Sequence, residues 1–268
     1  MSAGLLGHRV SGNGGPGEPP VLLLNGALMS LAAWQPAVTP LEKTRRVVRC
    51  DFRGQLFSQG PPQPDLEDHL ADVLRLLDHL QIGRVHLAGT SFGSLVALRL
   101  AARHPGRIAS VTAITSTPQI DAKAWHELKI IHDACLEAAD GGPTYDAGKV
   151  SDLSLPMFSD AYRAAQDANL AMQRDWIGML PEAWFRGVAG ILEAVKDLDL
   201  RPELSTIRCP ALVIGADQDY VFPPDHSQAL AAALPNARLE MVVSGHSLVV
   251  EQPERLAELL RSFLDSIR

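Results

Sequence analysis

Short continuous apolar runs alternate along the chain with segments in which apolar residues recur every three or four positions. The continuous runs are typical of strands buried on both faces of a sheet, and they occupy residues 21–26, 45–51, 84–89, 108–115 and 210–217. A further strand is predicted at residues 237–243. The three-to-four spacing predicts helices over residues 65–80 and 253–267. Further helices are expected over residues 92–104, where Pro105-Gly106 ends the helix, and over about 224–233. Strands and helices that alternate in this way predict an α/β fold, with a mostly parallel, twisted sheet and helices on both faces.

The N-terminal segment does not follow this alternation. A short strand is expected near residues 5–10, and the Gly- and Pro-rich segment 11–20 follows it. Because Gly and Pro favour tight turns, this segment is interpreted as the turn of an N-terminal hairpin that leads to the strand at 21–26.

The strand pattern stops between residues 118 and 200, where helical segments are broken by Gly and Pro. Because strands resume afterwards, this segment interrupts one sheet instead of following it. We therefore predict a core made of residues 1–117 and 201–268, with a helical cap inserted at 118–200. The cap holds three of the four tryptophans, 14 acidic residues and 7 basic residues, so the whole net charge of −7 lies there.

Charge and composition argue against several classes of partner. A chain with a net charge of −7 and no polybasic run is a poor ligand for nucleic acid or for an anionic membrane. No apolar run approaches the roughly 18 residues of a membrane span, and residues 1–10 lack the pattern of a signal peptide. Cys50, Cys135 and Cys209 are too far apart for a C-x-x-C pair, so no metal site, disulfide framework or cofactor is expected. The sequence predicts a cytoplasmic protein with a small-molecule substrate and does not indicate an oligomeric state.

One short motif lies between a predicted strand and a predicted helix. Gly89-Thr90-Ser91-Phe92-Gly93 fits the pattern G-x-S-x-G, in which a buried strand turns sharply into a helix. The turn lifts the serine hydroxyl above the carboxyl edge of the sheet, and the small residues on either side let neighbouring chain pass close by. Ser91 is therefore the candidate nucleophile.

A serine hydroxyl needs a base to take its proton, and that base needs an acceptor to orient it. His246, in the stretch SGHSL, follows the last predicted strand and precedes the closing helix, so it is the candidate base. Two acidic residues lie at the end of the run at 210–217 and just beyond it. We favour Asp219 as the orienting acceptor because it lies deeper in the loop, and Asp217 is interpreted as a solvated turn residue.

The oxyanion formed by attack on a carbonyl needs two backbone N–H donors. Phe92, directly after the candidate nucleophile, is predicted to supply one. Ala27, in the loop after the strand at 21–26, is the preferred source of the other, with Leu28 second. The aromatic content of the cap favours an apolar substrate group. The candidate substrate-binding side chains are Leu28, Trp125, Phe158, Trp176, Trp184 and Val221.

These motifs resemble the α/β-hydrolase superfamily over almost the whole chain. Ser91, Asp219 and His246 occur in the chain order of that family. The stretch DFRGQLFS is similar to its D-x-R-G-x-G-x-S motif, and GHSLVVEQPERLAELLRSFL is similar to its closing histidine-and-helix segment. The chain is most similar to capped bacterial enzymes of the 3-oxoadipate enol-lactonase type, followed by meta-cleavage-product hydrolases. It departs from the family where Asn25 replaces the usual His of a His-Gly pair and where Leu56 replaces the second glycine of R-G-x-G.

Three functions remain open at this point. The preferred one is a serine hydrolase that cleaves a small, apolar carboxylic ester or lactone through an acyl-enzyme on Ser91. The second uses the same residues to break a carbon–carbon bond next to a ketone, or to form a peracid. The third belongs to another class: a ligand receptor on a hydrolase fold with little turnover. The acidic cap is expected to slow the approach of anionic substrates.

Overall fold

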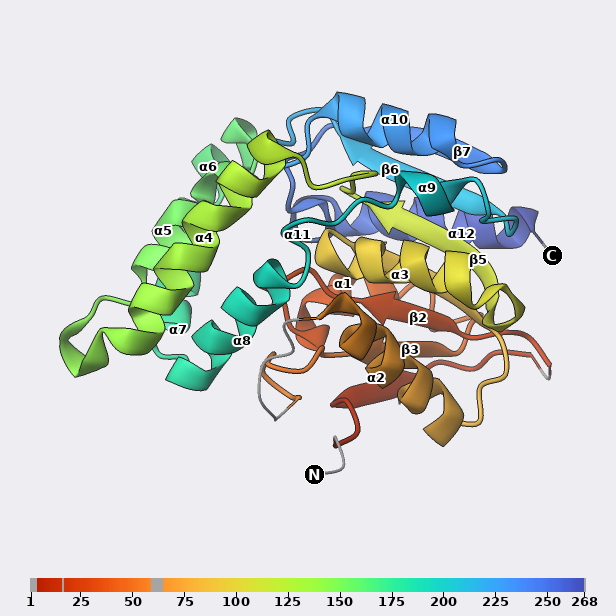
Figure 1. Cartoon of the computed structure of the whole chain (residues 1–268), viewed down its shortest axis with the longest axis horizontal. Coiled ribbons are helices and arrows are strands. Elements are labelled where there is room, and N and C mark those ends of the chain that lie inside the picture. Colours follow the sequence, from red (N-terminus) through yellow and green to blue (C-terminus); the bar gives the residue numbers. More distant parts are fainter. Residues whose placement is uncertain (1–3, 16, 59–64, 268) are drawn as a thin grey trace.

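Seven strands form a single sheet in the computed structural model, which describes residues 4–15, 17–58 and 65–267 (Figure 1). They lie in the order β1-β3-β2-β4-β5-β6-β7, and every neighbouring pair is parallel except β1 with β3. The strands are β1 (His8–Ser11), β2 (Val21–Leu24), β3 (Val47–Cys50), β4 (Val85–Thr90), β5 (Ile108–Ile114), β6 (Ala211–Ala216) and β7 (Ala237–Val242). The mostly parallel sheet predicted from the alternating pattern is confirmed.

Helices cover both faces of the sheet. Helices α2, α3 and α10 contribute to one apolar cluster, whereas α1 and α12 contribute to a second cluster on the opposite face (Figure 1). The helices that belong to the core are α1 (Gln35–Val38), α2 (Leu66–His79), α3 (Phe92–Arg103), α9 (Arg201–Leu204), α10 (Pro224–Ala233), α11 (Leu248–Glu251) and α12 (Pro253–Ser266). On α2, Leu66, Leu70, Val73 and Leu77 are buried, and the side chain of Asp65 caps the helix by accepting the N–H of Glu67.

The N-terminal strand is not part of a hairpin. Strand β1 pairs antiparallel with β3, in a register that places His8 opposite Cys50, so β3 lies between β1 and β2. Both sides of β2 are occupied by parallel neighbours, β3 and β4. The prediction of a hairpin is therefore wrong, because turn-forming residues do not determine which strand becomes the partner. The Gly- and Pro-rich segment carries the chain past β3 into the interior of the sheet.

Residues 118–200, called the cap below, form helices beside the carboxyl edge of the sheet, in green and teal at the left of Figure 1. The cap helices are α4 (Ala122–Asp140), α5 (Lys149–Ser154), α6 (Asp160–Ala165), α7 (Asp167–Gly178) and α8 (Glu182–Glu193). The ends of the cap bind each other: the N–H of Ile120 donates to the carbonyl of Leu198 at 2.8 Å, and the N–H of Leu200 donates to that of Pro118 at 2.9 Å. The cap therefore leaves and rejoins the core at one place.

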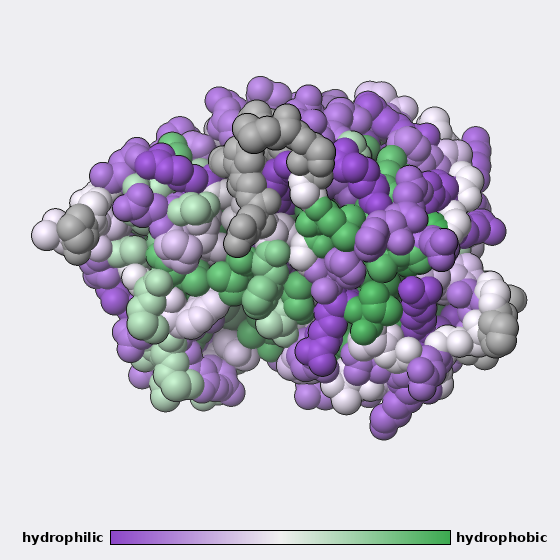
Figure 2. Space-filling view, turned by 90° about the horizontal axis from the view of Figure 1, so that it is seen from below, coloured by the Kyte–Doolittle hydropathy of each residue, from purple (hydrophilic) through white to green (hydrophobic). Residues whose placement is uncertain are grey.

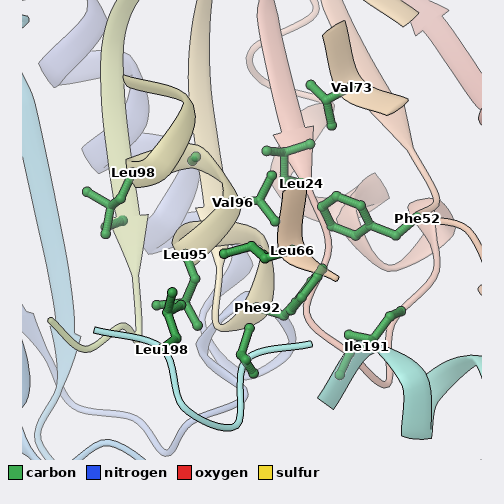
Figure 3. Packing of buried hydrophobic residues seen from close by; sticks show 14 of the residues in the cluster. Leu24, Phe52, Leu66, Val73, Phe92, Leu95, Val96, Leu98, Ile191 and Leu198 are labelled. Atoms are coloured by element: carbon green, nitrogen blue, oxygen red, sulfur yellow. The ribbon is translucent and has the colours of Figure 1, made fainter. Parts of the chain in front are cut away.

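The cap is anchored to the core by apolar side chains. Figure 2 shows hydrophobic residues gathered in the band between the cap, at the left, and the core, at the right. Figure 3 shows Ile191 of α8 and Leu198 on the cap side of the same buried cluster that contains Phe52 and Leu95 of the core. Among the helices of the described ranges, none has both the length and the hydropathy that crossing a membrane requires.

Candidate active site

Four loops meet at the carboxyl edge of the sheet, after β2, β4, β6 and β7. The strand ends are aligned, because Leu24 pairs with Gly89 and Ala216 pairs with Val242. The four loops carry the residues that the sequence singled out for chemistry, which are Ala27, Ser91, Asp219 and His246. Open α/β sheets bind ligands at this edge.

Ser91 lies in a strained turn between β4 and α3. Its backbone angles, φ 50° and ψ −119°, fall outside the regions that residues with a side chain normally adopt. A Cβ at Gly89 would lie 2.2 Å from the carbonyl oxygen of Gly93, and a Cβ at Gly93 would lie 2.3 Å from that of Leu24. Only glycine fits at these two positions. Because both residues lack a side chain, the strand can turn into the helix at Ser91 without a clash.

The side chains of Ser91, His246 and Asp219 form a hydrogen-bonded chain. His246 Nε2 lies 3.0 Å from Ser91 Oγ, and His246 Nδ1 lies 2.9 Å from Asp219 Oδ2 and 3.0 Å from Oδ1. The imidazole is buried and packs edge-on against Phe222, with 5.3 Å between the ring centres. A carboxylate beside Nδ1 favours the tautomer that carries its proton there, which leaves Nε2 able to accept the serine proton.

The two acidic residues near the end of β6 have different surroundings. Asp219 is buried, and its Oδ1 also accepts the N–H groups of Val221 and Phe222 at 2.9 and 2.8 Å. Asp217 is exposed, and its carboxylate accepts the N–H of Ser244 at 3.1 Å. The structure thus places Asp219 against the imidazole, whereas Asp217 ties the loop after β7 to the end of β6.

The predicted oxyanion donors lie on either side of Ser91. Phe92 is the first residue of α3, so its N–H has no acceptor within the helix. The loop after β2 lies against the serine: a Cβ at Gly26 would be 3.6 Å from Ser91 Cβ, and Ala27 and Leu28 line the same cavity. The N-terminus of α3 adds partial positive charge. The arrangement can therefore stabilise negative charge on an oxygen bound beside Ser91.

A buried amide, which the sequence analysis did not single out, holds the loop after β2 from beneath. Gln55 Nε2 donates to the carbonyl oxygens of Gly26 and Ala27 at 2.7 and 3.1 Å, and Oε1 accepts hydrogen bonds from Asn25 Nδ2 and from the N–H of Phe52. In a trans peptide the N–H points away from the C=O, so a fixed Gly26 carbonyl also fixes the direction of the Ala27 N–H. The position of Gln55 within DFRGQLFS is the signal that could have identified it.

Asn25, which stands where the family motif usually has histidine, extends this network. Its Nδ2 also donates to Asp51 at 2.9 Å, and its Oδ1 accepts the indole N–H of Trp34 at 2.8 Å. Burial raises the pKa of Asp51, while hydrogen bonds from the N–H groups of Phe57 and Leu31 and from the Asn25 amide oppose that shift. Asn25 therefore hydrogen-bonds the residues beneath the loop after β2, at the position where the family motif usually has histidine.

A cavity of about 430 Å³ lies over Ser91 and His246, between the loops of the sheet edge and the cap. Among the described residues that line it, none is a Lys, Arg, Asp or Glu. Three of the six candidate substrate-binding side chains, Leu28, Phe158 and Trp176, are part of the lining. The cavity suits an uncharged and mainly apolar group, in keeping with the hydrophobic band between cap and core in Figure 2.

The other three candidate substrate-binding residues lie elsewhere. Trp184 is 3% exposed and packs edge-on against Phe185 in the cluster between cap and core. Trp125 lies beneath the ammonium group of Lys196, which is 5.6 Å from the ring centre. Val221 lines a smaller neighbouring cavity of about 210 Å³. None of these three residues is among the described residues that line the cavity over Ser91. For Trp184 the reason is packing between cap and core, which decides which face of the cap an aromatic side chain covers.

Helical spacing identifies lining residues that the sequence analysis missed. On α7, Gln173 and Ile177 flank Trp176 on the face that covers the cavity. On α4, Leu128 and Ile131 are three positions apart and also line it. Residues three or four positions apart share one face of a helix, so the neighbours of Trp176 could have been found from its position alone.

The arginines of the cap form salt bridges with acidic residues of the cap. The pairs are Arg163–Asp160, Arg174–Asp146, Arg174–Asp152 and Arg186–Asp140. None of these arginines is among the described residues that line the cavity. An anionic group of a ligand would therefore meet no cap arginine within the described lining.

Comparisons with known proteins point to one family. A family model for the alpha/beta hydrolase fold matches residues 19–253. The chain is 29% identical to 3-oxoadipate enol-lactonase 1 of Acinetobacter baylyi, over 96% of this chain and 92% of that protein. It is 30% identical, over 96% of each, to a Stutzerimonas stutzeri protein named as the carbamate hydrolase RutD. Among solved structures it is similar to the enol-lactonase of Burkholderia xenovorans, with 31% identity, a TM-score of 0.84 and coverage of 97% of this chain and 96% of that one.

Proposed function

The chain belongs to the α/β-hydrolase family and is a hydrolase, and we propose that it cleaves a small, uncharged, mainly apolar carboxylic ester or lactone. Ser91 is the nucleophile, His246 the general base and Asp219 the residue that orients it. The observation that carries this proposal is the hydrogen-bonded chain of these three side chains at the floor of a cavity whose described lining has no Lys, Arg, Asp or Glu.

In the first half of the reaction, Ser91 Oγ attacks the substrate carbonyl carbon while His246 Nε2 takes the serine proton. The carbonyl oxygen becomes an oxyanion that accepts hydrogen bonds from the N–H groups of Phe92 and Ala27. The imidazolium, stabilised by Asp219, then gives its proton to the leaving oxygen as the C–O bond breaks. An acyl-enzyme on Ser91 remains, and the alcohol leaves; in a lactone the new hydroxyl stays on the acyl chain.

In the second half, a water molecule replaces the alcohol. His246 Nε2 takes a proton from this water as its oxygen attacks the acyl carbon, and the same two N–H groups hold the oxyanion. The proton returns to Ser91 Oγ as the acyl–oxygen bond breaks, which regenerates the serine. The acid product is an anion at neutral pH, and an uncharged cavity favours its release because a buried charge needs a partner.

The proposed substrate differs in charge from the one named for the enol-lactonase relatives. Because 3-oxoadipate is a dicarboxylate, a lactone formed from it keeps at least one free carboxylate. A carboxylate in the present cavity would lose its water without gaining a Lys or Arg partner among the described lining residues. The lining therefore supports a neutral aryl or short alkyl ester instead.

A fluorophosphonate probe, which labels activated serines, tests this proposal. We expect intact mass to show one label on the wild type, one on Ser30→Ala and none on Ser91→Ala. Ser30 is the matched control, because it lines the same cavity. Turnover of p-nitrophenyl butyrate is expected in the wild type and in Ser30→Ala, the two proteins that carry the label. Labelling that survives in Ser91→Ala would remove Ser91 as the nucleophile, and labelling without turnover would favour the receptor alternative.

A further inference from the structure

The loop that carries His246 is held by the cap as well as by the core. It follows β7 and leads to α11, and its core side is tied to the loop after β6. On its other side, the N–H of Ser247 donates to the carbonyl of Met157, in the cap, at 2.9 Å. The position of the imidazole therefore depends in part on where the cap segment 157–159 lies.

Glu251, at the end of α11, joins the same two segments. Its Oε1 accepts the N–H of Gly245 at 3.0 Å and the N–H of Ser159 at 3.1 Å, and its Oε2 accepts the Ser159 hydroxyl at 2.6 Å. Hydrogen bonds to a carboxylate are among the stronger ones in proteins. The reaction described above assigns no role to Glu251.

The two segments are also in direct contact. A Cβ at Gly245 would lie 2.6 Å from the backbone nitrogen of Ser159, 2.7 Å from the carbonyl oxygen of Met157 and 2.8 Å from Glu251 Oε1. Only glycine fits there, so the residue before His246 packs directly on cap backbone. A displacement of the cap segment therefore moves the histidine loop with it.

Met157 and Phe158 of this cap segment line the cavity, so the same short segment faces the substrate and the histidine loop. We propose that Glu251 is a positioning residue, which locks the cap segment to the loop of His246 and thereby keeps the imidazole within hydrogen-bonding distance of Ser91. This inference rests on the proposed function, because Glu251 acts through His246 and touches no reacting atom.

Two substitutions of Glu251 separate the hydrogen bonds from the negative charge. Glu251→Ala removes all three accepted hydrogen bonds. Glu251→Gln keeps an oxygen for the two N–H groups and places an NH₂ beside the Ser159 hydroxyl, which can accept. Glu254→Ala, an exposed glutamate in the first turn of α12, is the matched control. The measurements are kcat and KM for p-nitrophenyl butyrate, the rate of fluorophosphonate labelling and amide hydrogen exchange.

We expect Glu251→Ala to lower kcat and the labelling rate about 10- to 100-fold with little change in KM, because a misplacement of about 1 Å can cost roughly 10²-fold in rate. Glu251→Gln restores both rates, and Glu254→Ala leaves them unchanged. Amide exchange in residues 157–159 and 244–247 becomes faster in Glu251→Ala but not in Glu251→Gln.

Three results would overturn the inference: an unchanged kcat in Glu251→Ala, a rise in KM alone, or a Glu251→Gln enzyme as slow as Glu251→Ala. If Glu251→Ala does not fold, Ser159→Ala removes only the hydroxyl tie and is expected to lower kcat about threefold, as the loss of one modest hydrogen bond would; an unchanged kcat there also refutes the inference. A wild type that neither turns over esters nor takes the label refutes the proposed function instead. In that case, the comparison of amide hydrogen exchange in Glu251→Ala and Glu251→Gln still decides whether Glu251 joins the cap segment 157–159 to the loop of His246.

Discussion

The floor of the cavity consists of loop residues whose positions hydrogen bonds fix, whereas its roof consists mainly of apolar side chains from the cap. In the floor, Asp219 accepts two N–H groups besides the imidazole, and Gln55 holds two carbonyl groups. In the roof, Ile131 and Ile177 offer apolar surface, which cannot hydrogen-bond. Bond making requires positions fixed to a fraction of an ångström, but apolar contact is non-directional. We therefore expect floor substitutions to reduce rates steeply and roof substitutions to change substrate preference modestly.

The largest expected effect is in the floor, at Asp219. Asp219→Asn keeps the size of the side chain but removes the carboxylate that fixes the imidazole tautomer, so kcat for p-nitrophenyl butyrate should fall roughly 10⁴-fold. Asp217→Asn is the matched control, because Asp217 contacts a backbone N–H of the histidine loop and not the imidazole. Asp217→Asn is expected to remain active. If Asp217→Asn is the inactive variant and Asp219→Asn is not, the assignment of the two residues is reversed.

Gln55→Leu tests whether buried support of the floor matters as well as the groups that contact substrate. Leucine has a similar volume but no donor, so the peptide group between Gly26 and Ala27 loses the partner that fixes its direction. Because removal of a whole oxyanion donor costs about 10²- to 10³-fold, we expect kcat to fall about 10- to 100-fold.

The control for Gln55→Leu is Gln228→Leu on the exposed face of α10, which should leave kcat unchanged. Thermal unfolding of both variants separates a loss of fold from a loss of rate. Wild-type kcat in a folded Gln55→Leu enzyme would show that the loop after β2 does not need this support.

In the roof, Trp176→Ala should raise KM for p-nitrophenyl butyrate about 3- to 10-fold with little effect on kcat, since it removes apolar contact worth about 1 kcal/mol. Trp125→Ala is the matched control, because Trp125 lies in the same cap but outside the cavity lining. Steady-state kinetics on both variants compare the two tryptophans. Equal effects would mean that Trp176 acts through cap stability and not through substrate contact.

The smallest expected effect concerns charge. The net charge of −7 lies in the cap, so an ester with a terminal carboxylate should have a lower kcat/KM than a matched neutral ester. This disadvantage should shrink a few-fold as salt rises from about 0.01 M to about 0.1 M, because the Debye length falls from about 30 Å to about 10 Å. Matched esters assayed at the two salt concentrations give the ratio. A preference for the carboxylated ester that weakens with salt would instead favour a substrate of the enol-lactonase type.

Local pattern predicted most of the fold, because buried strands leave continuous apolar runs and amphipathic helices leave a three-to-four spacing of apolar residues. The helix at 224–233 has the predicted bounds, and the six strands predicted from residue 21 onward all correspond to strands of the sheet, with β4 extending one residue beyond its predicted end. The pairing of β1 was missed, because sheet order depends on which strand edges remain free after the whole chain has folded.

Chain order and strand ends singled out Ser91, His246 and Asp219, and the structure brings these side chains into one hydrogen-bonded chain. Their catalytic role stays a prediction. The hydrogen-bond partners of Gln55 and the side of the cap that Trp184 covers are what sequence alone could not give. The partners of a buried amide, and the side of a helix that meets the core, are set by contacts between segments far apart in the chain.

The cap begins and ends at neighbouring points, where residues 118–120 and 198–200 bind each other across the boundary. Because both ends of the insertion lie together and no described strand of the sheet lies within it, replacing the insertion would change no strand pairing. A different segment joined at the same two points would change the lining of the cavity without changing the strand ends that position Ser91, Asp219 and His246. Glu251 sets one condition on such an exchange: the incoming segment must present an acceptor where Met157 now lies and donors where Ser159 now lies.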